Sequence, residues 1–303
     1  MRKRAIVYQT FFLSGLMLAG SGIGFAQDSP LIQRGDVMTA RNILSTTRGY
    51  GVANAMSASA SGTSAIWHNP AGIAEAIMYT VDASYLYDHE TSGHGFQANV
   101  VDSKSNEYVS AGIGLLYEYG KPDKSQHLVN ARFGIAVPLA DRLICLGITG
   151  LYSYLKYDGN KIVSQFSMDA GVIVRPLEWM TIGFSAQNII VGDHAAYMPR
   201  ILSFGIAAGS LEYGFNFMFD ASFNPNADDI AKSADYSFGA EYLLKKLVPI
   251  RAGYRYEADN HHVLAVGLGY RDAGGMFGLD LAYQHHFKSH TSELFSASVD
   301  FYF

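Results

Sequence analysis

The chain has 303 residues and a formal net charge of −5; charged residues make up only 16%, beside 20 Tyr, 18 Phe and 31 Gly. An acidic chain without a basic run is a poor candidate for nucleic-acid binding. The single cysteine, Cys145, excludes an internal disulfide. Beyond the first 26 residues no segment approaches the roughly 18 consecutive apolar residues that a membrane-spanning helix needs.

The first 26 residues predict a secretory signal peptide. A basic start, Arg2-Lys-Arg4, precedes an apolar stretch from Phe11 to Gly24, and Gly24-Phe-Ala26 offers small residues for cleavage before Gln27. The alternative, a membrane anchor, is disfavoured because the apolar run is short, broken by glycines and lacks a stop-transfer flank. Loss of three basic residues and no acid would change the net charge from −5 to −8.

Residues 27–77 do not alternate between apolar and polar positions, and they are rich in Gly, Ala and Ser. Such a segment packs closely against other backbone and can thread a narrow lumen. A disordered linker is the alternative, but the grouped apolar residues Ile66, Trp67 and Ile73 favour burial. We therefore expect residues 27–77 to form a hatch, a plug that lies ahead of the main fold.

From residue 78 to residue 303 the chain alternates with the two-residue period of a β-strand. One face is apolar, with Tyr or Phe toward the strand ends, and the other holds Gly, Ser, Asn, Asp and Arg. The pattern predicts about fourteen strands, an even number as in single-chain bacterial barrels. The predicted strands cover residues 78–88, 94–102, 107–119, 129–138, 143–156, 161–175, 179–188, 200–209, 211–221, 233–244, 248–257, 262–271, 275–286 and 293–303.

Alternation alone fits a secreted β-sandwich or β-propeller as well as a membrane barrel. The predicted strands reach roughly 9–12 residues, the length that a tilted strand needs to cross a bilayer, whereas strands of globular proteins average about 5–6. The aromatic residues sit where a membrane girdle would lie. The last strand carries Phe301 and Phe303, which resemble the signal read by the barrel-assembly machinery. The favoured fold class is therefore all-β: a transmembrane antiparallel up-and-down barrel over residues 78–303.

The connections between predicted strands form two sets. If the C-terminus is periplasmic, the periplasmic links at 102–106, 138–142, 175–178, 210, 244–248 and 271–275 are short. The opposite set includes the longer polar links 88–94, 120–128, 189–199 and 222–232, and this asymmetry is typical of outer-membrane barrels. Asp158-Gly-Asn160 departs from the trend and predicts a tight hairpin turn.

The segment before the first strand resembles a known family. Gly51-Val-Ala-Asn-Ala55, the Ser/Ala stretch that follows, and Trp67-His-Asn-Pro-Ala-Gly-Ile73 are similar to the N-terminal signature of the FadL superfamily. Its core is Asn69, Pro70, Ala71 and Gly72. The superfamily includes fatty-acid and aromatic-hydrocarbon transporters and the PorV/PorQ-type proteins of type IX secretion.

The resemblance implies a 14-stranded barrel closed by the hatch, with Asn69 to Gly72 holding the hatch against the wall. In transporters of the family a hydrophobic ligand enters from outside, crosses an apolar pocket and leaves through a gap in the wall. The loops of this chain are shorter than those of the transporters, a build more like the PorV/PorQ branch, whose members are partners and anchors in secretion. Two functions therefore stay open: passive transport of small hydrophobic molecules, and a non-transporting partner barrel in protein secretion or surface assembly.

Strand parity places charged residues of both signs inside the predicted barrel, where they avoid the cost of facing lipid. We expect an ion-pair ladder that braces wall and hatch, rather than a selectivity-setting pore lining or a catalytic carboxylate pair. The predicted lumen charges are Asp82, Arg132, Asp169, Arg175, Asp235, Glu241, Arg251, Arg255, Asp280 and Asp300.

Parity also points apolar side chains inward, where they could line a ligand cavity; inward glycines leave room for either a ligand or a plug. The candidate ligand-lining residues are Leu86, Leu116, Leu151, Val163, Ile173, Met218, Val263 and Met276. A transporter should show an apolar cavity and a gap or kink in the wall, whereas a partner barrel should show a lumen filled by hatch and ion pairs.

Catalysis finds little support, because neither a nucleophile elbow nor a phosphate-binding glycine loop occurs. His261-His262, His285-His286 and His290 lie near loop ends, where metal ligation is the alternative to solvated side chains. Adjacent histidines on a strand face opposite sides, so at most one of each pair could join a site. We expect no enzyme activity, no cofactor and no metal; the expected partners are outer-membrane lipid, the assembly machinery, and a hydrophobic ligand or a secretion-system protein.

Overall fold

The computed structural model describes residues 44–89, 92–120, 125–192, 195, 197–210, 214–230, 233–257, 261–287 and 292–303. These residues belong to one compact unit, Ile32–Phe303. The predicted signal peptide, the first part of the predicted hatch up to residue 43, and His290 lie outside the described residues.

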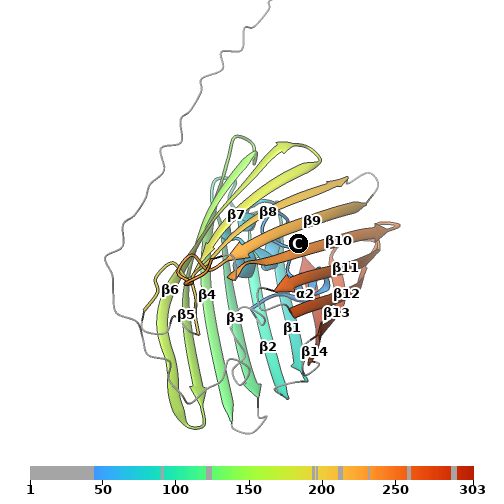
Figure 1. The fold of residues 1–303 in the computed structure, drawn as a ribbon. Coiled ribbons are helices and arrows are strands. Elements are labelled where there is room, and N and C mark those ends of the chain that lie inside the picture. The colour runs from blue at the N-terminus through green and yellow to red at the C-terminus, as the bar shows by residue number, and fades with distance from the viewer. Residues whose placement is uncertain are drawn as a thin grey trace, which may run out of the picture. The chain divides into compact units, whose positions relative to one another are not determined.

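Fourteen antiparallel strands close into a barrel (Figure 1). Each strand pairs with the next along the chain, and β1 closes the ring by pairing with β14, where Asp82 faces Asp300. The strands are β1 (Tyr79–Asp88), β2 (Gly93–Asp102), β3 (Ser110–Gly120), β4 (Gln126–Leu139), β5 (Ile144–Tyr157), β6 (Asn160–Leu177), β7 (Met180–Gln187), β8 (Ile201–Ser210), β9 (Phe215–Phe223), β10 (Asp235–Leu244), β11 (Val248–Glu257), β12 (His261–Arg271), β13 (Phe277–Phe287) and β14 (Ser292–Tyr302).

Every predicted strand is confirmed, and the largest boundary difference is the start of β9, at Phe215 rather than at residue 211. The tight turn between β5 and β6 is also present: Asp158 and Gly159 both adopt positive φ, 48° and 79°. A two-residue hairpin turn of the primed type requires this conformation at both central positions. Alternation predicted the strands well because each strand has one lipid-side face and one lumen-side face.

The outward face of the wall is apolar. Large side chains such as Phe133, Ile148 and Phe217 are exposed, whereas polar residues on the opposite parity are buried. A soluble protein would not leave such a belt of apolar surface in water, but a lipid-facing barrel requires it. No helix among the described residues has the length and apolar character to cross a membrane.

The described part of the hatch lies inside the ring of strands (Figure 1). It contains four short helical segments: α2 (Thr47–Gly51), η1 (Gly62–Ser64), α3 (Ala65–His68) and η2 (Pro70–Ala74). Met56, Ile66, Trp67 and Ile73 are at most 1% exposed and form one apolar core with wall residues. The lumen is therefore plugged, and residues 44–77 are not a disordered linker.

The lipid-facing assignment of the outer surface is testable at Leu115, which is half exposed in the middle of β3. We expect Leu115→Arg to destabilise folding into lipid vesicles by about 2–4 kcal/mol, because it places a charge near the bilayer midplane. Val109→Arg, just before β3, is the control and should cost about 0–1 kcal/mol near the interface. Equal costs at the two positions, measured by denaturant titration, would contradict the assignment.

Candidate functional site: the hatch and the lumen

Asn69 connects the hatch to the wall. It is fully buried, and its Nδ2 donates to Ser57 O at 2.6 Å and to the wall carbonyls of Val172 and Phe184 at 3.3 and 3.2 Å. Its Oδ1 accepts from the backbone N–H of Ala71 at 3.2 Å, which caps the start of η2. One side chain thus joins two parts of the hatch to strands β6 and β7.

Glycines let the hatch backbone approach the wall. A Cβ at Gly147 would overlap the backbone of Pro70 and Ala71, and a Cβ at its cross-strand partner Gly171 would overlap the Asn69 side chain. On β7, a Cβ at Gly183 would overlap the carbonyl of Ser57. These inward glycines therefore accommodate the plug, which the sequence alone could not distinguish from room for a ligand.

Asp220 on β9 holds the other side of the hatch. Its Oδ2 accepts the backbone N–H groups of Met56 at 2.9 Å and Ser57 at 2.7 Å. Asp220 was not among the predicted site residues, although its position on β9 faces the lumen by parity. Two successive backbone donors aimed at one carboxylate fix this turn of the hatch, because hydrogen bonds to a charged acceptor are stronger than neutral ones.

Ion pairs brace the wall and extend to the hatch. Arg251 on β11 pairs with Glu241 at 2.5 Å and with Asp280 at 2.6 Å. Arg271 also contacts Asp280, at 2.6 Å. From the hatch, Arg48 pairs with Glu241 at 3.3 Å and donates to Ser59 O at 3.1 Å. The chain Arg271–Asp280–Arg251–Glu241–Arg48 thus links four wall strands, β10 to β13, to α2.

A second set of charges lies beside Trp67. Arg132 and Asp169, both at most 4% exposed, pair at 2.8 Å, and the Arg132 guanidinium lies 4.8 Å from the centre of the Trp67 ring. Trp67 Nε1 donates to Asn99 Oδ1 at 2.8 Å, and Asn99 in turn donates to Asp82. The motif tryptophan is therefore fixed by a cation–π contact and a hydrogen bond.

The remaining predicted lumen charges have different surroundings. Arg175 pairs with Glu75 at the end of the hatch. Arg255 pairs with Glu257 of its own strand at 2.7 Å. Asp235 and Asp300 are buried on the lumen side. The hatch partners Arg48 and Glu75 were missed because residues 44–77 have no strand parity from which to predict direction.

Seven of the eight predicted apolar lining residues are buried in the wall. Leu86, Leu116, Ile173 and Met218 belong to the core shared with the hatch, whereas Leu151 and Val163 belong to a second apolar cluster. Val263 is fully buried on β12. The inward placement of Met276 is wrong: β13 begins at Phe277, so Met276 lies in the preceding turn, where parity does not apply, and is 60% exposed.

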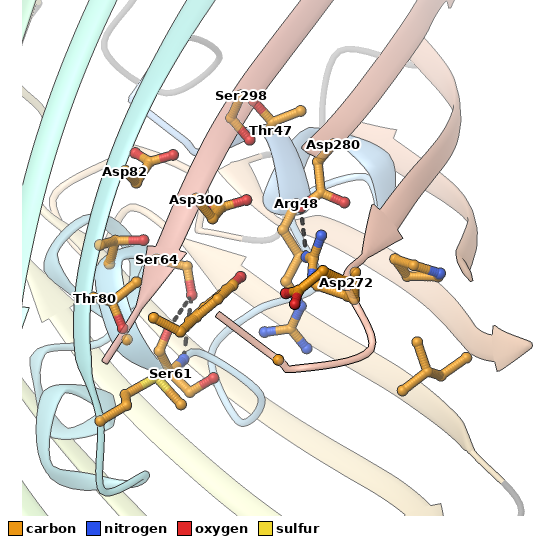
Figure 2. Close-up of a pocket in the computed structure, with 18 of the residues that line it drawn as sticks. Thr47, Arg48, Ser61, Ser64, Thr80, Asp82, Asp272, Asp280, Ser298 and Asp300 are labelled. Carbon is orange, nitrogen blue, oxygen red and sulfur yellow. Dashed lines mark hydrogen bonds and ion pairs between the residues drawn. The ribbon is translucent and has the colours of Figure 1, made fainter. Parts of the chain in front are cut away.

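A cavity of about 720 Å³ lies on the C-terminal side of the hatch, and most of the residues that line it are polar or charged. Figure 2 shows Asp82 and Asp300 on neighbouring strands, with Arg48 and Asp280 across from them. A smaller cavity of about 90 Å³ on the other side of the hatch includes Asp235 and His68. Neither cavity is the apolar pocket expected for a hydrophobic ligand.

Apolar residues gather instead on the side of the lumen away from the C-terminus. This second apolar cluster comprises Leu128, Leu151, Leu155, Val163 and Met198, with Ile162 and Tyr197 packed against it. The cluster covers the lumenal face of β4, β5 and β6. Met198 comes from the 188–200 connection and is only 4% exposed, so a loop side chain fills this apolar site.

The wall is irregular next to this cluster. The ladder between β6 and β7 starts at Ala170 and Ala186, so residues 160–169 of β6 have no β7 strand beside them. Strand β7 ends at Gln187, and Asn188 adopts a positive φ of 52°. Beyond this kink, Ile189 N donates to Met168 O at 2.8 Å, and side chains of β6 donate to Ile190 O.

The loop-end histidines do not converge. His285 is partly exposed on the outer face while His286 is 5% exposed on the inner face, as expected for neighbours on a strand. His262 bonds Tyr254 on the outer face. Among the described residues, no three His, Cys, Asp or Glu side chains are arranged to hold a metal ion.

Comparison with known proteins shows the fold. A scan against protein-family models and a search of curated proteins find no match. The CymD monoaromatic hydrocarbon channel matches with a TM-score of 0.64 at 13% identity, covering 86% of this chain and 97% of that one. A Pseudomonas aeruginosa FadL homologue matches at 0.59 and 12%, covering 85% and 98%. The Ralstonia pickettii toluene transporter TbuX matches at 0.57 and 14%, covering 83% and 97%.

The chain is thus a closed β-barrel plugged by its own N-terminal hatch, a class that includes transport channels. More narrowly, its fold is that of the FadL-type hydrophobic-compound channels, with fourteen strands. The resemblance read from the Asn69–Gly72 motif is confirmed at the level of the fold.

The role of Asn69 is tested by proteolysis at Arg48 in the hatch. Asn69→Ala removes both N–H donors of Nδ2, which serve three carbonyl oxygens, and should weaken hatch docking by about 1–3 kcal/mol. Asn69→Asp sets a carboxylate against three carbonyl oxygens and should cost more, at least about 3 kcal/mol. We expect trypsin to cleave Asn69→Ala faster than the wild type, and Asn69→Asp faster still. Asn106→Ala, in an exposed turn, is the control; unchanged cleavage of Asn69→Asp would contradict the role.

Acid should loosen the hatch through His68. Burial in the lumen, with Arg132 and Arg48 nearby, lowers the pKa of His68 from 6.5 to about 3. The docked hatch therefore binds fewer protons than the released hatch, and its stability falls as the pH drops from about 6.5 toward 3, by at most about 1.4 kcal/mol per pH unit. His68 also lies 2.9 Å from Ser45 Oγ through Nε2.

Trp67 fluorescence reports this release once Trp179, the second of the two tryptophans, is replaced. In Trp179→Phe protein we expect the emission to shift to longer wavelength below about pH 6. Adding His68→Gln should remove most of the pH dependence. If the acid transition is the same in Trp179→Phe protein with and without His68→Gln, groups other than His68 cause the release.

Proposed function

We propose that the protein transports small hydrophobic molecules passively across the outer membrane, with its C-terminus in the periplasm. The predicted signal peptide, the lipid-facing belt and the short turns on the C-terminal side support this location and orientation. The fold shared with CymD and TbuX, named as a hydrocarbon channel and a toluene transporter, supports the class of substrate.

The observation that carries the proposal is that the second apolar cluster lies beside the irregular part of the wall. Val163 of the cluster lies within the part of β6 that lacks a β7 neighbour. A hydrophobic molecule that displaced Met198 would contact Leu128, Leu151 and Leu155. From there it could leave sideways between β6 and β8 and avoid the polar cavity beyond the hatch.

Polar surroundings make the straight route unfavourable. On the C-terminal side of the hatch an apolar molecule would meet Arg48, Asp82, Glu241 and Asp300 around the 720 Å³ cavity. Desolvating these groups without replacing their hydrogen bonds is costly. The lateral route starts among the apolar side chains of the second apolar cluster and ends in lipid, without crossing the 720 Å³ cavity.

A substitution at Met198 distinguishes a specific site at the second apolar cluster from nonspecific binding of toluene to apolar surface. We expect Met198→Ala to bind toluene at least about tenfold more tightly, because it empties an apolar cavity beside the same walls. Val163→Arg should abolish binding. Both are measured by titration calorimetry on the purified barrel.

Met218→Ala is the matched control, since it makes the same substitution in the core shared with the hatch. Toluene binding that rises equally in Met218→Ala and Met198→Ala would show that any cavity suffices and would contradict a site at the second apolar cluster.

One observation favours the alternative of a non-transporting partner barrel in secretion or surface assembly. The described hatch fills the lumen against glycines and is bonded to the wall through Asn69, Asp220 and Arg48. A barrel whose only task is to present its surfaces requires no open route. Co-purification of an outer-membrane protein with a wild-type barrel that binds no toluene would favour this alternative.

A further inference from the structure

Three hairpins carry the same aromatic arrangement on the outer surface. In each, a Tyr-x-Tyr sequence ends one strand and a histidine starts the next, and the second tyrosine faces the histidine in the ladder. We call each set a Tyr-His unit. The units are Tyr85, Tyr87 and His94 on β1–β2; Tyr117, Tyr119 and His127 on β3–β4; and Tyr254, Tyr256 and His262 on β11–β12.

The geometry inside the units repeats as well. The hydroxyl of the first tyrosine lies 2.7, 3.0 and 2.6 Å from the histidine Nδ1 in the three units, in chain order. The ring of the second tyrosine lies 5.2, 5.0 and 5.4 Å from the imidazole centre. With the phenol O–H as the donor, Nδ1 accepts, and a neutral imidazole then carries its hydrogen on Nε2.

The units lie at one rim of the barrel. They end strands whose outward residues nearer the middle, such as Phe96, Leu115 and Leu264, are exposed and apolar. The opposite rim has aromatic contacts without imidazole, such as Tyr79 with Phe303. Among the described strand residues, all histidines lie in the half away from the C-terminus: His94, His127, His261, His262, His285 and His286.

A lysine adds positive charge to the β3–β4 unit. Lys156 on β5 is the ladder partner of His127, and strand parity places it on the outer face. Lys156 forms no ion pair with any described residue. An imidazole N–H donor and a free ammonium on neighbouring strands are complementary to an anion.

We propose that the Tyr-His units bind the phosphate groups of the phosphorylated glycolipid, of the lipid A type, in the outer leaflet. Tyrosine rings at a barrel rim lie at the headgroup level, where they contact the upper acyl chains. The Nε2–H groups then provide donors at the depth of the phosphates. A purely aromatic girdle would need no imidazole, and the histidines of the described strands all lie toward the rim that the proposed orientation turns outward.

Phosphate recognition is tested with two lipids that differ in one group: bisphosphorylated lipid A and monophosphoryl lipid A. Native mass spectrometry of the full barrel in detergent counts each lipid retained. The wild type should prefer the bisphosphorylated lipid by about tenfold, as expected for one charge-assisted hydrogen bond. The triple variant His94→Phe, His127→Phe and His262→Phe keeps the aromatic rings and should lose the preference; Lys156→Ala should reduce it.

The control is Lys245→Ala with Lys246→Ala, at the turn between β10 and β11 on the opposite rim, which should leave the preference unchanged. Heat-dependent gel migration confirms that each variant is folded. A preference that survives in the triple histidine variant, or that falls equally in the control, would overturn the proposal. Because the units share no residue with the second apolar cluster, either outcome leaves the toluene experiments unaffected.

Discussion

The close approach of hatch backbone to wall backbone is the contact on which the rest of the structure depends. A barrel of fourteen strands encloses more space than wall side chains alone can fill. Here the inward positions Gly147, Gly171 and Gly183 of the wall carry no side chain, and the hatch packs directly against them. Asn69 then hydrogen-bonds across this contact to Ser57 and to wall carbonyls.

This contact divides the lumen into two regions of different chemistry. On the C-terminal side, ion pairs link Arg48 of the hatch to Glu241 and Arg251 of the wall around a polar cavity. On the other side, Met198 and neighbouring wall residues form an apolar cluster beside the kink at Asn188. A hydrophobic molecule in the lumen would therefore meet polar groups ahead and an irregular wall beside it, and the proposed lateral route rests on that contrast.

The outer surface has a similar contrast between its two rims. Both carry aromatic residues, but imidazoles bonded to tyrosine occur at the rim away from the C-terminus. The inner and outer leaflets of an outer membrane differ in headgroup chemistry, so different rims are expected for a barrel with a fixed orientation. The residues that line the lumen and those that form the outer rims are different, because successive residues of a strand face opposite sides.

The barrel could be predicted from the sequence because the lipid face and the lumen face impose strict alternation over every strand. The same parity placed Arg132, Arg251 and Asp280 inside correctly. Parity gives no direction in turns, which is why the placement of Met276 was wrong and Met198 was missed.

The hatch partners were beyond sequence reasoning for a related reason. Arg48 lies in α2 and Glu75 directly after η2, and contacts with the wall, not a local period, set the directions of their side chains. Asp220 was overlooked because an inward carboxylate on β9 has no special pattern; its function depends on two backbone N–H groups more than 160 residues away. The motif at Asn69 was recognisable, but its bonds to Val172 and Phe184 required the folded barrel.

We propose that the hatch stays in place and that hydrophobic molecules leave through the wall. Thr47 Oγ1 of the hatch and Ser296 Oγ of β14 lie 2.7 Å apart, so Thr47→Cys with Ser296→Cys can join them by a disulfide once Cys145 is replaced by Ala. Toluene uptake is then measured in cells whose outer membrane contains the cross-linked barrel. If the hatch stays in place, we expect the same rate of toluene uptake before and after reduction of the disulfide. Uptake that stops on cross-linking and returns on reduction would contradict it, because the molecule would then have to pass where the hatch now lies.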